Sequence, residues 1–109
     1  MNAEIEIFER YRSTGIVQGE ELLLRHSDAL RFIADCEQLG LMILGMNFYK
    51  QQDDDIIELL CPADYSSLSL EDNALEQSIA AARRLIEYQL PEDATWVSFT
   101  VEERTPKVR

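Results

Sequence analysis

The sequence predicts an α+β fold, in which a small antiparallel or mixed sheet of three to four strands packs against two to three helices. Apolar residues recur at helical spacing in three segments and alternate or run together in three others. Glycine or proline stands at most of the boundaries between these segments. A chain of 109 residues, 46% of them hydrophobic, can bury one core but is too short for two, so residues 1–109 are expected to form a single domain.

An N-terminal helix is predicted over residues 3–14, with a connection up to residue 19. The apolar residues behind this prediction stand three positions apart: Ile5, Phe8 and Tyr11. Gly15 is expected to end the helix with a positive φ. Residues 19–25 are ambiguous, since two glutamates followed by three leucines suit either a short helix or the start of the next one.

A second helix is expected to begin at Ser27, whose side chain would cap it, with Asp28 at the positive end of the helix dipole. Its apolar face would be formed by Ala29, Leu30, Ile33 and Cys36. Gly40 is placed to close this helix.

Residues 41–60 predict a β-hairpin with a polar turn at 51–54 and a second strand at 56–60. The first strand is apolar on both faces, which is typical of a central or covered strand. Strict alternation would give it one face with Met42, Leu44, Met46 and Phe48 and another with Leu41, Ile43 and Tyr49. Gly45 suggests a bulge or a close backbone approach.

The last third of the chain predicts a long helix and a final strand. Asp72 or Asn73 is expected to cap the helix, with Asn73 and Glu76 in capping-box register, and Pro91 to stop it. The apolar face of this helix comprises Leu75, Ile79, Ala82 and Ile86. Residues 95–101 alternate as a strand does. Val97, Phe99 and Val101 would face the core, and Trp96, Ser98 and Thr100 would face outward.

Five residues are predicted for the core because each lies on the apolar face of its element: Ile33, Leu44, Ile79, Ile86 and Phe99. Cys36 and Cys61 fit no metal spacing and have apolar neighbours, so they are predicted to be buried free thiols. Residues 103–109 are expected to be a frayed tail.

Charge restricts the class of partner. The chain carries 21 acidic and 10 basic residues, a net charge of −11. Nucleic acid is excluded because phosphate binding needs clustered Lys and Arg, and an anionic membrane is disfavoured by the same repulsion. A basic protein partner suits this charge. The sequence shows neither a signal peptide nor the ~20 apolar residues that cross a bilayer, so a cytoplasmic protein is expected.

No catalytic, metal or cofactor site is predicted, and an enzyme is not expected. His26 is the only histidine, and it is interpreted as a plain helix-entry residue rather than a functional one. The four glycines stand alone and form no phosphate-binding loop. A calcium loop starting at Asp53 fails because Glu58 takes the place of the glycine and Asp64 that of the glutamate.

A base-free acidic stretch is the main candidate for a binding surface. Residues 51–82 contain no Lys or Arg but eight acids: Asp53, Asp54, Asp55, Glu58, Asp64, Glu71, Asp72 and Glu76. These acids suit an ordinary solvated surface, a face that docks a basic protein, or a metal or carboxylate pair. Trp96 is either an exposed binding anchor or covered by a helix or a second copy. The predicted partner-binding residues are Asp53, Asp54, Asp55, Asp64 and Trp96.

Two short segments carry a resemblance to a known family. Residues 27–30 are Ser-Asp-Ala-Leu, and after a helix residues 42–45 are Met-Ile-Leu-Gly, followed by Phe48 and Tyr49. This order resembles a small family of immunity proteins from bacterial polymorphic-toxin systems. In that family the same helix start precedes an Ile-Leu-Gly-Gly-Asp-Val-Tyr strand, a turn, a second strand, a helix and a final strand.

The resemblance covers residues 22–102, with some departures. Met46 and Asn47 stand where the family has its second glycine and an aspartate, and the Asp-Asn-Trp-Tyr signature is reduced to Asp64 and Tyr65. The resemblance implies a toxin inhibitor that binds a toxic domain through protein–protein contacts. The alternative is a non-enzymatic interaction subunit or homodimer joined through the Trp96 face, and an enzyme with an acidic cleft is the third hypothesis.

Overall fold

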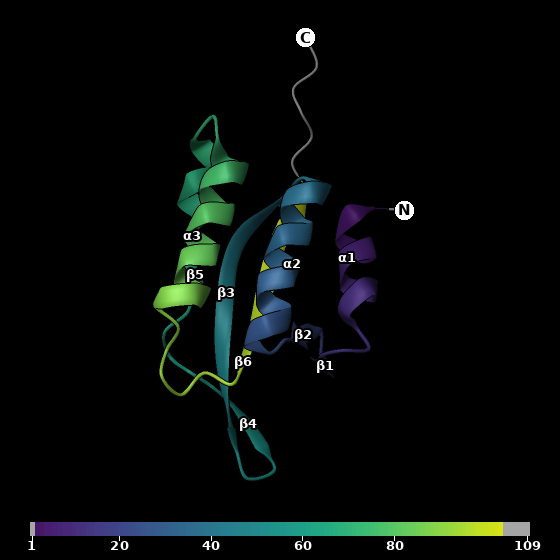
Figure 1. Cartoon of the computed structure of the whole chain (residues 1–109), viewed down its shortest axis with the longest axis vertical. Helices are drawn as coiled ribbons and strands as arrows, with labels where there is room; N and C mark the ends of the chain where they lie inside the picture. The colour runs from purple at the N-terminus through teal and green to yellow at the C-terminus, as the bar shows by residue number, and fades with distance from the viewer. Residues whose placement is uncertain (1, 104–109) are drawn as a thin grey trace.

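The computed structural model describes residues 2–103 and confirms the α+β class, with a four-stranded antiparallel sheet, a two-stranded hairpin and three α-helices in this part of the chain. Helices α2 and α3 lie on one face of the sheet and α1 lies beside α2 (Figure 1). The predicted frayed tail lies outside the described residues except for Glu103, which still belongs to the last strand. Within residues 2–103, no helix is long and apolar enough to cross a membrane.

Helix α1 spans Ala3–Tyr11 and ends earlier than predicted. Its N-terminus is capped by Asn2, whose Oδ1 accepts the N–H of Ile5 at 3.0 Å. The prediction that Gly15 ends the helix with a positive φ is wrong. Glycine is needed there because the backbone of Leu23 lies very close. A Cβ on residue 15 would be only 2.5 Å from the carbonyl oxygen of Leu23.

Residues 16–23 form a β-hairpin, and neither helical interpretation of this region is correct. Strands β1 (Ile16–Gln18) and β2 (Glu21–Leu23) pair antiparallel around Gly19, which has φ 64°. A positive φ at the first of two turn residues favours glycine and closes a tight hairpin. Leu24 then exchanges two backbone hydrogen bonds of 2.8 Å with Val97, which attaches the hairpin to the main sheet.

Helix α2 spans His26–Leu39, so it begins one residue before the predicted cap. Arg25 is the N-cap residue and no side chain caps the helix, so the prediction for Ser27 is wrong. Asp28 lies in the first turn as expected, and its carboxylate accepts from Arg31 at 2.6 Å. Gly40 closes the helix in the left-handed conformation with φ 71°, as predicted.

Helix α3 spans Ala74–Tyr88 and follows a short 3-10 helix, η1 (Ser66–Leu70). Asn73 is the N-cap residue, but the capping box with Glu76 does not form. The side chain of Asn73 instead accepts from Gln77 at 2.5 Å. The helix ends three residues before Pro91, which is consistent with a proline placed just beyond a C-terminus.

Strand β3 (Leu41–Gln52) is the centre of the sheet. Strands β4 (Asp55–Glu58) and β5 (Ala63–Asp64) pair with one edge of β3, and β6 (Trp96–Glu103) pairs with the other. All of these pairs are antiparallel. The hairpin predicted over residues 41–60 is therefore confirmed.

The register between β3 and β6 shifts between Ile43 and Gly45, which confirms the bulge. A Cβ on Gly45 would lie 2.7 Å from the carbonyl oxygen of Ala63, so the close approach is present as well. Because of this shift, the side chains after Gly45 point to the opposite face of the sheet from the one that strict alternation would give. Leu41, Ile43, Met46 and Phe48 consequently pack in one core, and the strict alternation expected for β3 is wrong.

The main core lies between the helices and one face of the sheet. Ile33, Ile79 and Ile86 are at most 1% exposed, and Phe99 is partly buried and stacks on Phe32 with ring centroids 4.6 Å apart. Leu44 is partly buried and lies outside the main cluster, because the bulge turns it away from Met46 and Phe48. The core prediction therefore holds for four of these five residues.

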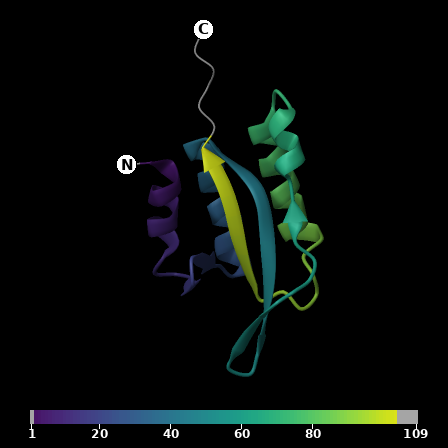
Figure 2. The ribbon, with the colours of Figure 1, turned by 180° about the vertical axis from the view of Figure 1, so that it is seen from behind.

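A second, smaller cluster lies on the opposite face of the sheet, which no helix covers (Figure 2). It consists of Leu23, Tyr49 and Trp96, with Ile16 and Ile56 packed against it. The β1–β2 hairpin covers this face where α2 and α3 cannot reach.

Candidate functional site

The tip of the β3–β4 hairpin is the most prominent acidic feature of the predicted site. Asp53, Asp54 and Asp55 are consecutive and exposed, and the hairpin extends past the ends of the helices (Figure 1). Asp53 has φ 55°, a left-handed conformation that aspartate tolerates better than most residues. Among residues 2–103, none of the three carboxylates forms an ion pair, so their charge stays available to a partner.

Gln51 holds the tip in place. Its Nε2 donates to the carbonyls of Asp53 at 2.9 Å and Asp55 at 3.3 Å, while its Oε1 accepts from Nε1 of Trp96 at 3.2 Å. The backbone N–H of Gln51 also donates to the hydroxyl of Thr95 at 3.3 Å. The start of β6 and the residue before it therefore support the acidic turn through Gln51.

Trp96 is 4% exposed, so its interpretation as an exposed anchor is wrong. As predicted, the side chain of Trp96 points away from the main core. However, Leu23 and Tyr49 pack on its ring, and the guanidinium of Arg25 lies 4.5 Å from the ring centroid. The cover comes from this chain's own hairpin rather than from a helix or a second copy. Burial also removes the observation on which a homodimer through Trp96 rested.

Asp64 lies away from the tip, in β5 opposite Gly45. Its Oδ1 accepts from the backbone N–H of Ser66 at 2.9 Å and from the hydroxyl of Ser66 at 2.7 Å. These two hydrogen bonds lower the pKa of Asp64 below its ordinary value. The carboxylate is used to turn the chain into η1, so Asp64 is a structural residue rather than part of the tip.

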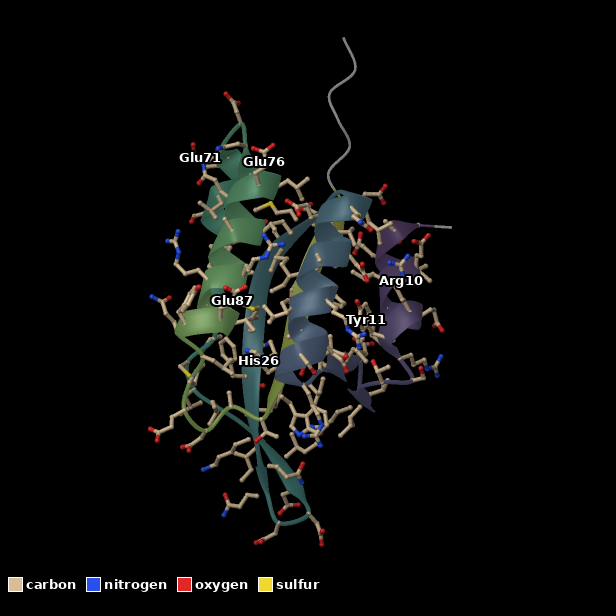
Figure 3. The ribbon with its side chains drawn as sticks, viewed as in Figure 1. Arg10, Tyr11, His26, Glu71, Glu76 and Glu87 are labelled. Atoms are coloured by element: carbon tan, nitrogen blue, oxygen red, sulfur yellow. The ribbon has the colours of Figure 1, made fainter. Side chains whose placement is uncertain are left out.

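The base-free stretch does not form one continuous surface. Glu71 follows η1 and Glu76 lies in the first turn of α3, and the hairpin tip lies at the opposite end of the molecule (Figure 3). The acidic residues of the stretch 51–82 are thus divided between two ends of the molecule. Asp53, Asp54 and Asp55 remain together at one of them.

His26 has a structural contact. Its Nε2 donates to the carbonyl oxygen of Ile86 at 3.2 Å, which ties the start of α2 to the last turn of α3 (Figure 3).

In residues 2–103, no three His, Cys, Asp or Glu side chains are grouped as metal ligands would be. Tyr11 donates to Asp35 at 2.5 Å and Arg10 pairs with the same carboxylate at 3.2 Å, so this cluster is internally satisfied.

Sequence reasoning missed Glu21, which occupies the helix-free face of the sheet. Its carboxylate accepts hydrogen bonds from the hydroxyl of Tyr49, from Nδ2 of Asn47 at 3.3 Å and from Oγ of Ser98 at 3.2 Å. Burial and the bond to Glu21 raise the pKa of Tyr49 above its ordinary value. No local pattern marks Glu21, because its three partners lie 26 to 77 positions away in the sequence.

This chain matches no family model, no curated protein and no solved structure. The resemblance of residues 27–30 and 42–45 to immunity proteins therefore stays a prediction. Any function must be inferred from the surfaces of this chain itself.

The two cysteines differ in a way that the sequence did not predict. Cys36 is fully buried, and burial raises the pKa of its thiol. Cys61 is exposed beside Pro62, so its predicted burial is wrong.

We expect a thiol reagent to label Cys61 at least about 100-fold faster than Cys36 in the folded protein, because Cys36 reacts only after local opening. Intact mass measured over time would show one adduct, then two after denaturation. Cys61→Ser is the control, and rapid labelling of that variant would contradict the burial of Cys36.

Proposed function

We propose that this protein is an immunity-type binding protein that neutralises a bacterial toxin domain through direct association of its acidic surface. The observation that carries the proposal is the hairpin tip, where Asp53, Asp54 and Asp55 are exposed, consecutive and free of ion pairs within the described part of the chain. The resemblance of residues 27–30 and 42–45 to toxin-immunity proteins adds to it.

Electrostatics gives the proposed mechanism. Toxic nuclease domains are basic because they bind phosphate, and an acidic inhibitor attracts such a domain at a distance. Charges at the rim of an interface mainly accelerate association, whereas buried contacts slow dissociation. The tip is suited to the first role, since it projects from the body of the protein and is held in a defined turn by Gln51.

The function is tested by expressing candidate toxic domains from neighbouring genes, with and without this protein, and counting surviving cells. Survival only in the presence of this protein, together with a complex of the two purified proteins, would support neutralisation. A toxic domain that kills equally well in both cases and forms no complex would refute it.

The role of the tip is tested by changing Asp53, Asp54 and Asp55 together to Asn. We expect the association rate with the toxic domain to fall by about tenfold at low salt and by less at high salt, because steering is screened by ions. Asparagine also tolerates the left-handed conformation of residue 53, so the turn is retained. Stopped-flow or surface-based kinetics at two ionic strengths measures both effects.

A matched control removes three charges from the other acidic end: Glu71→Gln, Asp72→Asn and Glu76→Gln. These residues are also exposed. Glu71 and Glu76 lie away from the tip (Figure 3), and Asp72 is next to Glu71 in the chain. We expect this variant to lose less than half of the association rate. Equal losses in the two variants would assign the effect to net charge, and an unchanged rate in the Asp53/54/55 variant would remove the tip from the mechanism.

A further inference from the structure

A groove separates α1 from β6 on the side of the molecule far from α3. Its volume is about 570 Å³, and its apolar walls include Ile5 and Phe8 of α1 and Phe99 and Val101 of β6. Figure 2 shows α1 standing beside the free side of β6, opposite the side that β3 occupies. Ile5 is 54% exposed, so an apolar side chain at the mouth of the groove is open to solvent.

The floor of this groove is an open sheet edge. Val97 directs its N–H and C=O away from β3, since both bond to Leu24. Hydrogen-bonding direction alternates along a strand, so the N–H and C=O of Phe99 and Val101 point to the same edge. Within residues 2–103, no hydrogen-bond partner of these groups lies beyond that edge, because the hairpin pairing stops at Leu24. An open edge of this kind can accept another strand.

The groove also carries charge of one sign. Four acidic residues line it and neither Lys nor Arg does in the described part of the chain: Glu4, Glu9, Glu20 and Glu21. Glu4 and Glu9 belong to α1, whereas Glu20 and Glu21 belong to the β1–β2 hairpin, so two separate elements bring acid to the same edge. A strand laid along β6 would therefore place its side chains against apolar walls and among carboxylates.

We propose that this groove binds an extended, basic segment of a partner protein, which pairs with β6 as an added strand. Main-chain hydrogen bonds to Phe99 and Val101 would align the segment, and alternate side chains would enter the groove beside Ile5 and Phe8. The remaining side chains would be Lys or Arg, which the glutamates attract. The open part of β6, residues 98–103, suits a segment of about six residues at about 3.3 Å per residue.

The charge of the groove favours this occupant over a second copy of the chain. A symmetric pairing of two β6 edges would bring the four groove glutamates of one copy close to those of the other, in a chain of net charge −11. The groove can accept a basic segment whether or not the partner is a toxin.

A short peptide with four Lys-Val repeats tests the proposal, with four Glu-Val repeats as the control peptide. Amide hydrogen exchange is measured residue by residue by NMR. In the free protein, Phe99 and Val101 should exchange faster than Ser98 and Thr100, which face β3. Saturating Lys-Val peptide should slow exchange at Phe99 and Val101 by at least about tenfold, and the Glu-Val peptide should have no effect.

Two variants locate the binding. Ile5→Arg, at an exposed position, places a cation at the mouth of the groove and should weaken peptide binding by about tenfold or more. Leu70→Arg makes the same change of charge at another exposed apolar residue and should alter it less than about twofold. The Asp53/54/55→Asn variant should still protect Phe99 and Val101, so that loss of the tip and loss of the groove are distinguishable.

Three results would overturn the proposal. The first is unchanged exchange at Phe99 and Val101 when the peptide binds. The second is a concentration-dependent dimer that Ile5→Arg abolishes, because a second copy would then be the occupant. The third is slow exchange at these amides in the free protein that becomes fast when residues 104–109 are deleted, since the chain's own basic residues would then fill the groove.

Discussion

Replacing Ile86 by alanine is expected to lower the free energy of unfolding by about 2–5 kcal/mol. Ile86 is 1% exposed and lies in the last turn of α3, the helix that packs against both α2 and β3. The loss combines the transfer of the aliphatic side chain with the cavity left behind, because two helices and a strand can collapse only partly into it. The hydrogen bond from His26 to the carbonyl of Ile86 stays in place, since it is made by the backbone.

Tyr88→Ala is the matched control for this substitution. Tyr88 lies two residues further along α3 and is 79% exposed, so its removal should change the free energy of unfolding by less than about 0.5 kcal/mol. Urea unfolding followed by circular dichroism measures both variants. A loss below about 0.5 kcal/mol for Ile86→Ala would mean that α3 does not bury this face.

The helices were predictable because their signal is local. The stripe at Ile79 and Ile86 lies within one helix and needs no knowledge of the partner surface. Both helices were predicted correctly, but Ser27 is not the N-cap residue of α2, and Asn73, although it is the N-cap residue of α3, forms no capping box with Glu76. At the start of α2 a distant contact competes with local capping, since His26 joins the helix and bonds to Ile86 sixty residues away.

The β1–β2 hairpin could not be distinguished from a helix because both of its faces are buried. Leu22 and Leu24 pack in the main core, whereas Leu23 packs with Trp96 on the opposite side. Such a strand appears in the sequence as a continuous apolar run. A continuous run has no apolar–polar period, so it cannot distinguish a strand from a helix. Gly19 was the only local sign of a turn.

The candidate site shows the same division between local and distant information. The exposed tip at Asp53, Asp54 and Asp55 followed from a polar turn between two strands, which is a local pattern. The register of Trp96 was also correct, but its exposure was not, because exposure depends on a hairpin that lies about 75 residues earlier in the chain. The groove along β6 involves α1 and the same hairpin, so no single segment of the sequence indicates it.

Replacing Glu21 by alanine is expected to lower the free energy of unfolding by about 2–4 kcal/mol, since it leaves donors on Asn47, Tyr49 and Ser98 without their acceptor. The expected loss of stability is smaller than the cost of three lost hydrogen bonds, because the variant no longer has to transfer a carboxylate out of water when it folds. Glu20→Ala, at the exposed neighbouring position, is the matched control and should cost less than about 0.5 kcal/mol.

The same substitution should change the dependence of stability on pH. The pKa of Tyr49 is raised in the folded protein, first by burial and then by its bond to Glu21. Folding therefore favours the protonated phenol, and this contribution is complete below about pH 10 and is lost as the pH rises further. Tyr11 also has a raised pKa and adds to the same fall, so Tyr49→Phe is needed to isolate the contribution of Tyr49.

Urea unfolding at about pH 8 and about pH 11 measures this effect in four proteins: the parent, Glu21→Ala, Tyr49→Phe and the double variant. We expect the loss of stability between the two pH values to be smaller in Glu21→Ala than in the parent, and the double variant to be less destabilised at about pH 8 than the sum of the single variants. Strict additivity would show that Glu21 and Tyr49 act independently, and the bond between them would then contribute nothing to the attachment of the hairpin to the sheet.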